Sequence, residues 1–187
     1  MIPALRRLIS VMSPDPSHDT LFKTWLEEHR GIIVKVTRSF ARSPADAADL
    51  EQELQLQIWI SLKSFAGQAK TSTWIYRVCL NTALTWRRGT ARRESHLAPE
   101  ADVALIATEA ASPADRAGEQ ELLEKLYAAI HALPDFDRAL VLLALDGLPY
   151  REIAEVTGLT ENHVGVALTR ARKRLAALLK GVTDELE

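Results

Sequence analysis

Four carboxylates lie close together in the chain, at Asp46, Asp49, Glu51 and Glu53. Paired carboxylates can catalyse hydrolysis or hold a magnesium ion. No glycine-rich loop that could cradle a phosphate stands beside them in the sequence, and their spacing places them on a single helix. An acidic surface that faces solvent or a partner protein is therefore the stronger interpretation of this cluster.

The other residue types that could do chemistry do not form a site. The five histidines are scattered, without the four-residue spacing or the HExxH arrangement that grips a metal. Cys79 is the single cysteine, which excludes an internal disulfide and a zinc site built from cysteines. We interpret it as a small core residue in a protein of the reducing cytoplasm. We expect no enzymatic activity, no metal and no cofactor.

The distribution of charge points instead to contacts with other macromolecules. The 187 residues carry 25 acidic and 23 basic side chains, so the net charge of −2 does not by itself indicate a nucleic-acid partner. Residues 71–93, however, hold five arginines and no acid, and residues 160–180 hold five basic residues and one acid. Residues 94–121 hold seven acids and one arginine. Two basic blocks are thus separated by an acidic one.

The second basic block belongs to a helix-turn-helix pattern over residues 148–179. Ile153 gives the first helix an apolar face, Gly158 can take a left-handed turn, and Thr160 can cap the second helix. That second helix carries apolar residues at helical spacing (Val164, Leu168, Ala171, Leu175, Leu178) and basic residues towards its end (Arg170, Arg172, Lys173, Arg174). The pattern predicts a motif that docks on DNA. The alternative is a surface αα-hairpin with a solvated basic end.

Helical periodicity runs through most of the remaining chain, and we find no strand alternation and no internal repeat. It predicts helices over residues 19–41, 44–62 and 72–88, then over 119–132 and 134–145. The expected fold is all-α, with two small helical domains joined by a flexible linker. The predicted boundaries are a poorly ordered leader at 1–18, a first domain at 19–93, an acidic linker at 94–118, a second domain at 119–181 and a tail at 182–187.

No stretch of the sequence approaches the roughly 20 apolar residues that a membrane-spanning helix needs. The N-terminal segment MIPALRRLISVM is short and interrupted by charge, and no cleavage site of small residues follows it. We therefore expect a soluble, cytoplasmic protein that does not insert into a membrane.

Three segments together resemble the bacterial RNA polymerase sigma factors of the sigma-70 family, in the small extracytoplasmic-function (ECF) group. DAADLEQELQLQIW (46–59) resembles the region 2 helix that faces the clamp helices of polymerase. STWIYRVCLNTALTWRR (72–88) resembles the segment that melts the promoter and reads its −10 element. LPYREIAEVTGL (148–159) with HVGVALTRARKRL (163–175) resembles region 4, which reads the −35 element. The resemblance covers most of residues 19–179.

The resemblance implies three groups of site residues. The polymerase-binding group is Asp49, Gln52 and Glu53. The group at the −10 element is Trp74, Arg77, Asn81, Arg87 and Arg88, with the loop at residues 65–72 receiving a flipped base. Cations beside aromatic side chains suit this task, because separated strands offer phosphates and unstacked bases. Trp74 could stack on the melted region or lie in the core, and we favour the core. The group at the −35 element is Thr160, Asn162, His163, Thr169, Arg170, Arg172 and Lys173.

Two places depart from the family's pattern. Thr85 stands where relatives often carry an acid that pairs with an arginine. Gly165, Val166 and Ala167 fill places where the recognition helix usually presents Lys or Arg, Ser and Arg. Readout of the −35 element would then depend on the other residues of that group, or region 4 would act mainly through the polymerase flap or a partner. For His163, a base contact, a phosphate contact and an idle surface position stay open.

The partners that the resemblance implies are core RNA polymerase, promoter DNA and an anti-sigma protein. One alternative is a helix-turn-helix regulator that binds an operator as a dimer, which would leave the pattern over residues 46–88 unexplained. The other is a protein-interaction module that uses sigma-like surfaces to sequester a partner. In the family, the linker threads towards a basic channel of polymerase, so Glu100, Asp102 and Glu109 are candidates for contacts along the route of nascent RNA.

Overall fold

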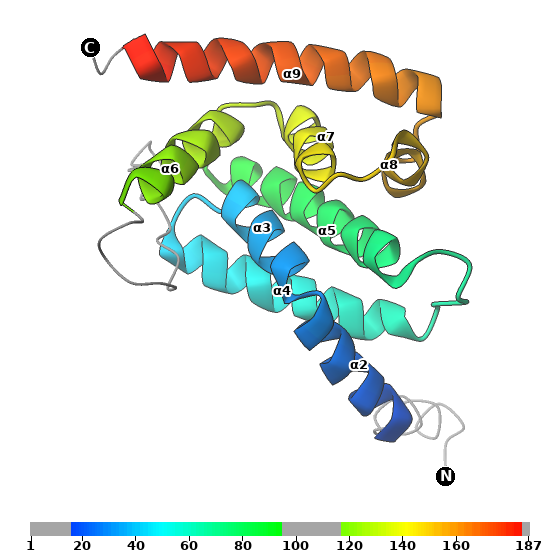
Figure 1. Ribbon diagram of the computed structural model, residues 1–187. Helices are drawn as coiled ribbons and strands as arrows, with labels where there is room; N and C mark the ends of the chain where they lie inside the picture. Colours follow the sequence, from blue (N-terminus) through cyan, green and yellow to red (C-terminus); the bar gives the residue numbers. More distant parts are fainter. Residues whose placement is uncertain (1–15, 95–116, 185–187) are drawn as a thin grey trace.

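The computed structural model describes residues 16–94 and 117–184, and all regular secondary structure in these two stretches is helical (Figure 1). The first stretch contains α2 (Pro16–Glu28), α3 (Arg30–Phe40), α4 (Pro44–Leu62) and α5 (Thr71–Glu94). The second contains α6 (Ala117–His131), α7 (Asp135–Leu145), α8 (Tyr150–Thr157) and α9 (Glu161–Asp184). The predicted all-α fold with two small helical units is confirmed. Most of the predicted leader and linker, including Glu100, Asp102 and Glu109, lies outside the described residues.

The N-terminal lobe, α2 to α5, forms where the sequence places caps and apolar stripes. Ser43 caps α4 by accepting a hydrogen bond from the backbone N–H of Asp46 at 3.1 Å, and Pro44 occupies the first turn. The stripe Leu50, Leu54, Ile58 and Leu62 is buried, and it packs against Ile75, Cys79 and Ala83 of α5. The opposite face of α4 therefore points outward, and Asp49 and Gln52 are exposed on it.

The helix expected over residues 19–41 is in fact two helices, and this prediction was wrong. The chain turns at His29, where His29 N–H bonds to the Trp25 carbonyl at 3.0 Å and Ile32 N–H bonds to the His29 carbonyl at 2.9 Å. Because apolar residues recur at helical spacing on both sides of this turn, the sequence pattern does not reveal it. The change of direction brings Phe22 edge-on to Trp59 of α4, with ring centroids 5.0 Å apart.

The C-terminal lobe, α6 to α9, contains the predicted helix-turn-helix. Gly158 ends α8 in the left-handed region at φ 75°, which a residue with a side chain rarely adopts. The backbone N–H of His163 donates to Thr160 Oγ1 at 3.4 Å at the start of α9. Ile153, Val164 and Leu168 are fully buried between the two helices. The motif is therefore built as the sequence predicts.

The two lobes pack against each other. One apolar core runs from Phe40, Leu54 and Ile75 in the N-terminal lobe to Leu140 and Ile153 in the C-terminal lobe. In Figure 1, α8 lies beside the start of α5, α6 lies beside α3, and α9 crosses the top of the C-terminal lobe. The sequence did not indicate this contact between lobes, and it determines which candidate site residues are accessible.

Candidate functional site

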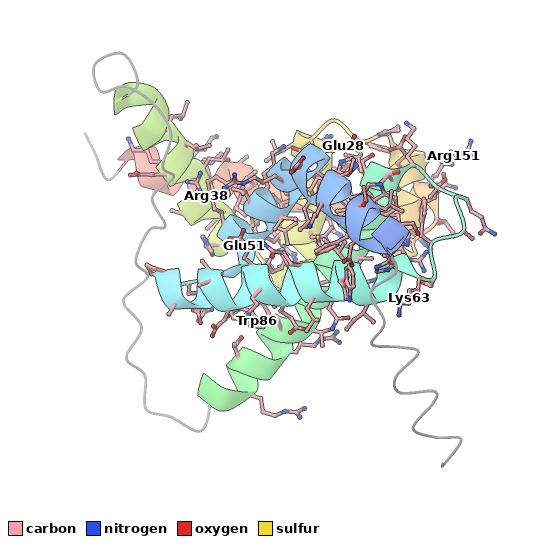
Figure 2. The ribbon with its side chains drawn as sticks, turned by 90° about the horizontal axis from the view of Figure 1, so that it is seen from below. Glu28, Arg38, Glu51, Lys63, Trp86 and Arg151 are labelled. Carbon is pink, nitrogen blue, oxygen red and sulfur yellow. The ribbon has the colours of Figure 1, made fainter. Side chains whose placement is uncertain are left out.

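The outer face of α4 carries the residues predicted to bind polymerase. Asp49 and Gln52 are exposed, Glu53 is half-buried, and all three line a groove of about 500 Å³. Leu56, which is 48% exposed, and Trp86 of α5 complete this groove. Figure 2 shows Trp86 where α5 passes α4. Two carboxylates, an amide and two apolar side chains thus line the groove, a combination that suits a protein partner that presents cations.

Two members of that groove were missed by sequence reasoning. Trp86 of α5 is half-buried and lines the groove, although the sequence assigned it to no site. Leu56 lies two positions from the buried residues Leu54 and Ile58, so it points to the other side of the helix and is exposed. An exposed leucine four residues after Gln52 was the available signal, since residues four apart on a helix share a face.

One of the α5 residues predicted to face the −10 element, Asn81, lies next to the α4 groove. Arg77, Asn81 and Arg88 are exposed on α5, as their helical spacing predicts. Asn81 and Glu53 line a common groove of about 370 Å³, together with Gln57, Thr82, Thr85 and Trp86. The acidic face of α4 and the polar face of α5 are thus one continuous surface.

Thr85 partly replaces the acid that relatives often carry at its position. The Arg88 guanidinium donates from Nη2 to Thr85 Oγ1 at 3.2 Å and from Nε to the Leu84 carbonyl at 3.1 Å. These two bonds hold the stem of Arg88 along α5 without neutralising its charge. A cation that keeps its charge and a defined direction is suited to a phosphate contact.

The loop between α4 and α5 forms a pocket of about 520 Å³. Phe65, Trp74 and Arg77 line it, with Thr73 and smaller loop residues, and Glu155 of the C-terminal lobe also contributes. The Trp74 ring is half-buried and packs edge-on to Phe65 and Trp25, with centroids 5.3 Å and 5.6 Å away. Trp74 therefore belongs partly to the core and partly to the pocket, so both interpretations of this residue describe part of its surface.

Arg87 does not lie on the predicted DNA-facing surface in this arrangement. It is 6% exposed and faces α7, where its Nε lies 3.9 Å from Asp135 Oδ1 and has no hydrogen-bond partner. Its position follows the buried residues Leu80 and Ala83 at spacings of seven and four, so the helical stripe was the signal that places it inward. A phosphate contact by Arg87 requires the lobes to separate.

Two carboxylates of the C-terminal lobe bind polar groups of the N-terminal lobe. Glu152 of α8 accepts a hydrogen bond from Thr73 Oγ1 at 3.0 Å and forms an ion pair with Lys70. The hydrogen bond from Lys70 lowers the pKa of Glu152 below its ordinary value. Asp146 after α7 pairs with Lys35 and accepts from the Tyr76 hydroxyl. The contact between lobes is therefore apolar at its centre and ionic at its edge.

Buried cations support the end of α6 at the lobe boundary. Arg138 donates to the carbonyls of Ile130, His131 and Leu133 at 3.1, 2.7 and 2.9 Å, and its guanidinium lies 5.1 Å from the centroid of Phe40. Burial, followed by the charge of Arg138, lowers the pKa of His131 to about 4. His131 is consequently neutral at neutral pH.

The outer face of α9 presents the residues predicted to read the −35 element. Thr160, Asn162, His163, Thr169, Arg170, Arg172 and Lys173 are all exposed. Thr160 Oγ1 caps α9 as an acceptor and keeps its own hydrogen to donate, whereas Thr169 Oγ1 already donates to the Gly165 carbonyl at 2.8 Å. Arg174, by contrast, forms an ion pair with Asp137 of α7 within the lobe. The donors that stay available on this face are thus Thr160, Asn162, His163, Arg170, Arg172 and Lys173.

Metal binding and membrane insertion find no support in the part of the chain that the structure describes. Within residues 16–94 and 117–184, no group of three or more His, Cys, Asp or Glu side chains could hold a metal ion. No helix in these same ranges is long and apolar enough to cross a membrane.

Comparison with known proteins identifies both lobes. Residues 25–93 match the family model for sigma-70 region 2, and residues 123–175 match the model for sigma-70 region 4. An ECF RNA polymerase sigma-E factor of Haemophilus influenzae is 32% identical over 147 residues, which cover 75% of this chain and 77% of that protein. The ECF RNA polymerase sigma-E factor of Escherichia coli K12 is 30% identical over 141 residues, covering 70% and 72%.

Two solved structures share the fold at 22% identity. One is the sigma factor RpoE in complex with the anti-sigma factor NepR from Bartonella quintana, with a TM-score of 0.67 over 85% of this chain and 96% of that chain. The other is CnrH in complex with the cytosolic domain of CnrY, with a TM-score of 0.61 over 87% and 90%. With both conserved regions matched in order and curated relatives aligned over most of their length, the chain belongs to the sigma-70 family as an ECF RNA polymerase sigma factor.

Proposed function

We propose that this sigma factor binds core RNA polymerase through the groove on α4 and opens promoter DNA along the adjoining face of α5. The single observation that carries this assignment is the continuity of the two surfaces, because Glu53 and Asn81 line the same groove. Asp49, Gln52 and Glu53 are assigned to polymerase, with Leu56 and Trp86 as apolar anchors. A protein that holds polymerase and melted DNA at once needs such adjacent sites.

On the α5 side, Arg77 and Arg88 contact the backbone of the −10 element, and Asn81 offers an amide to a base. The pocket beside Phe65, Trp74 and Arg77 receives a flipped base, because it combines aromatic walls with a cation. The face of α9 contacts duplex DNA upstream, at the −35 element.

Initiation in this proposal requires the lobes to separate. Arg87 is buried against α7, where its Nε lies 3.9 Å from Asp135 Oδ1 without a hydrogen bond, and Glu155 of α8 forms part of the wall of the base pocket. An unpaired buried donor is costly, so the packed arrangement holds Arg87 in an unfavourable environment. Separation exposes Arg87 to phosphate and removes Glu155, whose negative charge would repel a nucleotide.

An anti-sigma protein and a cytoplasmic location complete the proposal. The fold neighbours RpoE and CnrH are each seen with a regulatory partner, NepR and the cytosolic domain of CnrY. A protein of this kind that bound the packed lobes of this chain would keep Arg87 covered. Sigma factors direct initiation without enzymatic activity of their own, and membership of the family confirms that the chain is not an enzyme.

Run-off transcription with purified core polymerase tests the proposal. A sigma factor gives promoter-specific initiation by itself, a helix-turn-helix regulator changes initiation only when another sigma is present, and a sequestering module gives none. The Asp49→Ala, Gln52→Ala double variant should lower the affinity for core by about fivefold or more. The matched control is Glu27→Ala, on an exposed position of α2 outside the groove.

A second pair of variants separates polymerase binding from DNA opening. Arg77→Ala with Arg88→Ala should keep the affinity for core and reduce strand opening, measured by permanganate reactivity of unpaired thymines. Unchanged opening in this variant would overturn the assignment of α5, and unchanged core affinity in the α4 variant would overturn the assignment of the groove.

A further inference from the structure

Val166 occupies the middle of the outer face of α9. The residues Asn162, His163, Val166, Thr169, Arg170 and Lys173 recur at spacings of three and four and are all exposed, so they share one face of the helix. Val166 is 62% exposed, whereas its neighbour Ala167 is buried. An apolar β-branched side chain therefore projects from the centre of a face whose ends carry hydrogen-bond donors and cations.

The turn that carries Val166 is held in place from α8. A Cβ atom at Gly165 would lie 3.4 Å from Cε2 of Tyr150, so the tyrosine ring packs directly against α9 at this glycine. Thr169 Oγ1 donates to the Gly165 carbonyl at 2.8 Å, which engages the hydrogen of that hydroxyl. Val166 is thus presented on a supported turn, and the residue that follows it on the face offers no free hydroxyl donor.

The chemistry of the major groove indicates what such a face can recognise. Base edges there present hydrogen-bond donors, acceptors and one apolar group, the C5-methyl of thymine. Asn162 and His163 can address acceptors at one end of the face, and Arg170 and Lys173 can address acceptors or phosphates at the other. The Val166 side chain can neither donate nor accept a hydrogen bond, so the thymine methyl is the base feature that it complements.

We propose that Val166 reads the methyl group of a thymine in the −35 element, a role that rests on the proposed docking of α9 in upstream duplex DNA. The three positions Gly165, Val166 and Ala167 then have different neighbours. Gly165 lies against the Tyr150 ring, Ala167 is buried in the core, and Val166 faces the DNA. The recognition helix reads sequence through shape and apolar contact at its centre instead of through a basic side chain.

Single exposed apolar residues are common on protein surfaces and often carry no role. Val166 differs from such residues because polar side chains assigned to DNA surround it on its own helix face. Valine is also a weaker helix former than alanine, and at an exposed position no core packing compensates for this. An exposed valine here is therefore a cost to the helix that a DNA contact would offset.

Selection of promoter DNA by the holoenzyme tests the proposal. The full chain with core polymerase is used to select duplexes from a library whose randomised segment is long enough for both promoter elements. The selected promoters should share a thymine at one position of the −35 element. Replacing that thymine by uracil removes the methyl group alone and should weaken binding about fourfold, the factor expected for one buried carbon. Replacing the pair by 5-methylcytosine with guanine should retain part of the binding that unmethylated cytosine loses.

Two variants connect the methyl group to the side chain. In Val166→Ala, the holoenzyme should bind the thymine and uracil duplexes equally. In Lys173→Ala, a change at a proposed phosphate contact, binding should weaken on both duplexes by the same factor, so the fourfold ratio should remain. Circular dichroism should show unchanged helix content in both variants.

The results distinguish this proposal from the proposed function. A holoenzyme that initiates normally but shows no sensitivity to uracil, or a Val166→Ala variant that keeps that sensitivity, would overturn the role of Val166 alone. Loss of affinity for core polymerase in Val166→Ala would instead make the valine a protein contact, and would also overturn it. Absence of initiation at any promoter would overturn the proposed function and this role with it.

Discussion

Reversing the charge of Glu152 should open the packed lobes. In the native chain, this carboxylate accepts from Thr73 at 3.0 Å and pairs with Lys70, and both partners belong to the other lobe. The variant Glu152→Lys removes both contacts and places two ammonium groups side by side. We expect the free chain to shift towards separated lobes, with Arg87 exposed.

The magnitude of this shift follows from the solvent exposure of the pair. The Lys70 side chain is 72% exposed, so loss of the ion pair is worth at most about 1 kcal/mol. Repulsion between the two lysines adds an amount of the same order. Loss of the hydrogen bond from Thr73 adds about 1 kcal/mol more. A total of about 1 to 3 kcal/mol corresponds to a change of roughly five- to 160-fold in the equilibrium between packed and separated lobes.

Energy transfer between two dyes measures the separation. Cysteines introduced at the exposed positions Lys63 and Ala177, one on each lobe, can be labelled selectively because Cys79 is buried and its pKa is raised to about 12. The double reversal Lys70→Glu with Glu152→Lys should restore the native transfer efficiency. The control Glu155→Gln should leave it unchanged, since no ion pair or hydrogen bond joins Glu155 to the other lobe among the described contacts.

The same assay can refute the role of the Glu152 contacts in holding the lobes together. If Glu152→Lys has the transfer efficiency of the native chain at low salt, the ionic edge does not contribute to lobe packing. If the lobes separate in Glu152→Lys and stay separated in the charge-swapped double variant, the separation arises from a change in α8 and not from loss of the Lys70–Glu152 ion pair. Salt should weaken the native contact, because a partly exposed ion pair is screened.

Three further predictions concern buried groups. Replacing Arg138 by methionine should lower the free energy of unfolding by roughly 3 to 5 kcal/mol, because the carbonyls that accept from it lose a charged donor; urea unfolding should show a lower midpoint with an unchanged slope. The folded-state pKa of His131, about 4, lies below the ordinary value of 6.5, so the unfolded chain binds more protons between these values and stability should fall as the pH falls through this window. The variant His131→Gln should flatten that dependence in unfolding curves taken across the same range, and a dependence that persists would assign it to other groups. Cys79, buried with a pKa of about 12, should be alkylated at neutral pH only through opening of the N-terminal lobe, so mass spectrometry should detect modification at the rate at which the core opens, rising with urea.

Several features of the fold were predictable because local chemistry specifies them. Ser43 with Pro44 marks the start of α4, and Gly158 marks the turn between α8 and α9. The stripe that begins at Leu50 identifies the buried face of α4, so the opposite placement of Asp49 and Gln52 followed directly. The prediction failed at His29, where the helical pattern continues through a turn that no proline interrupts.

The exposure of a candidate site residue was predictable only where it follows from packing within that residue's own lobe. Arg77 and Asn81 are exposed because residues at their spacing on α5 point away from Ile75 and Cys79. Arg87 was assigned to DNA through the resemblance to sigma factors, yet it continues the buried stripe and faces Asp135. Trp86 was assigned to no site, yet it lines the groove beside Glu53. In both cases the neighbours lie on another helix, which residue type does not reveal.

The order of the helices, the cap at Ser43, the turn at Gly158 and the buried stripe of α4 were determined by the sequence alone. These properties depend on contacts between residues a few positions apart, and such contacts recur at a fixed period. Tertiary structure decided that the lobes pack together, that Arg87 is covered and that Glu152 reaches Thr73. Those contacts join residues 48 to 79 positions apart, and their geometry follows from how whole helices pack.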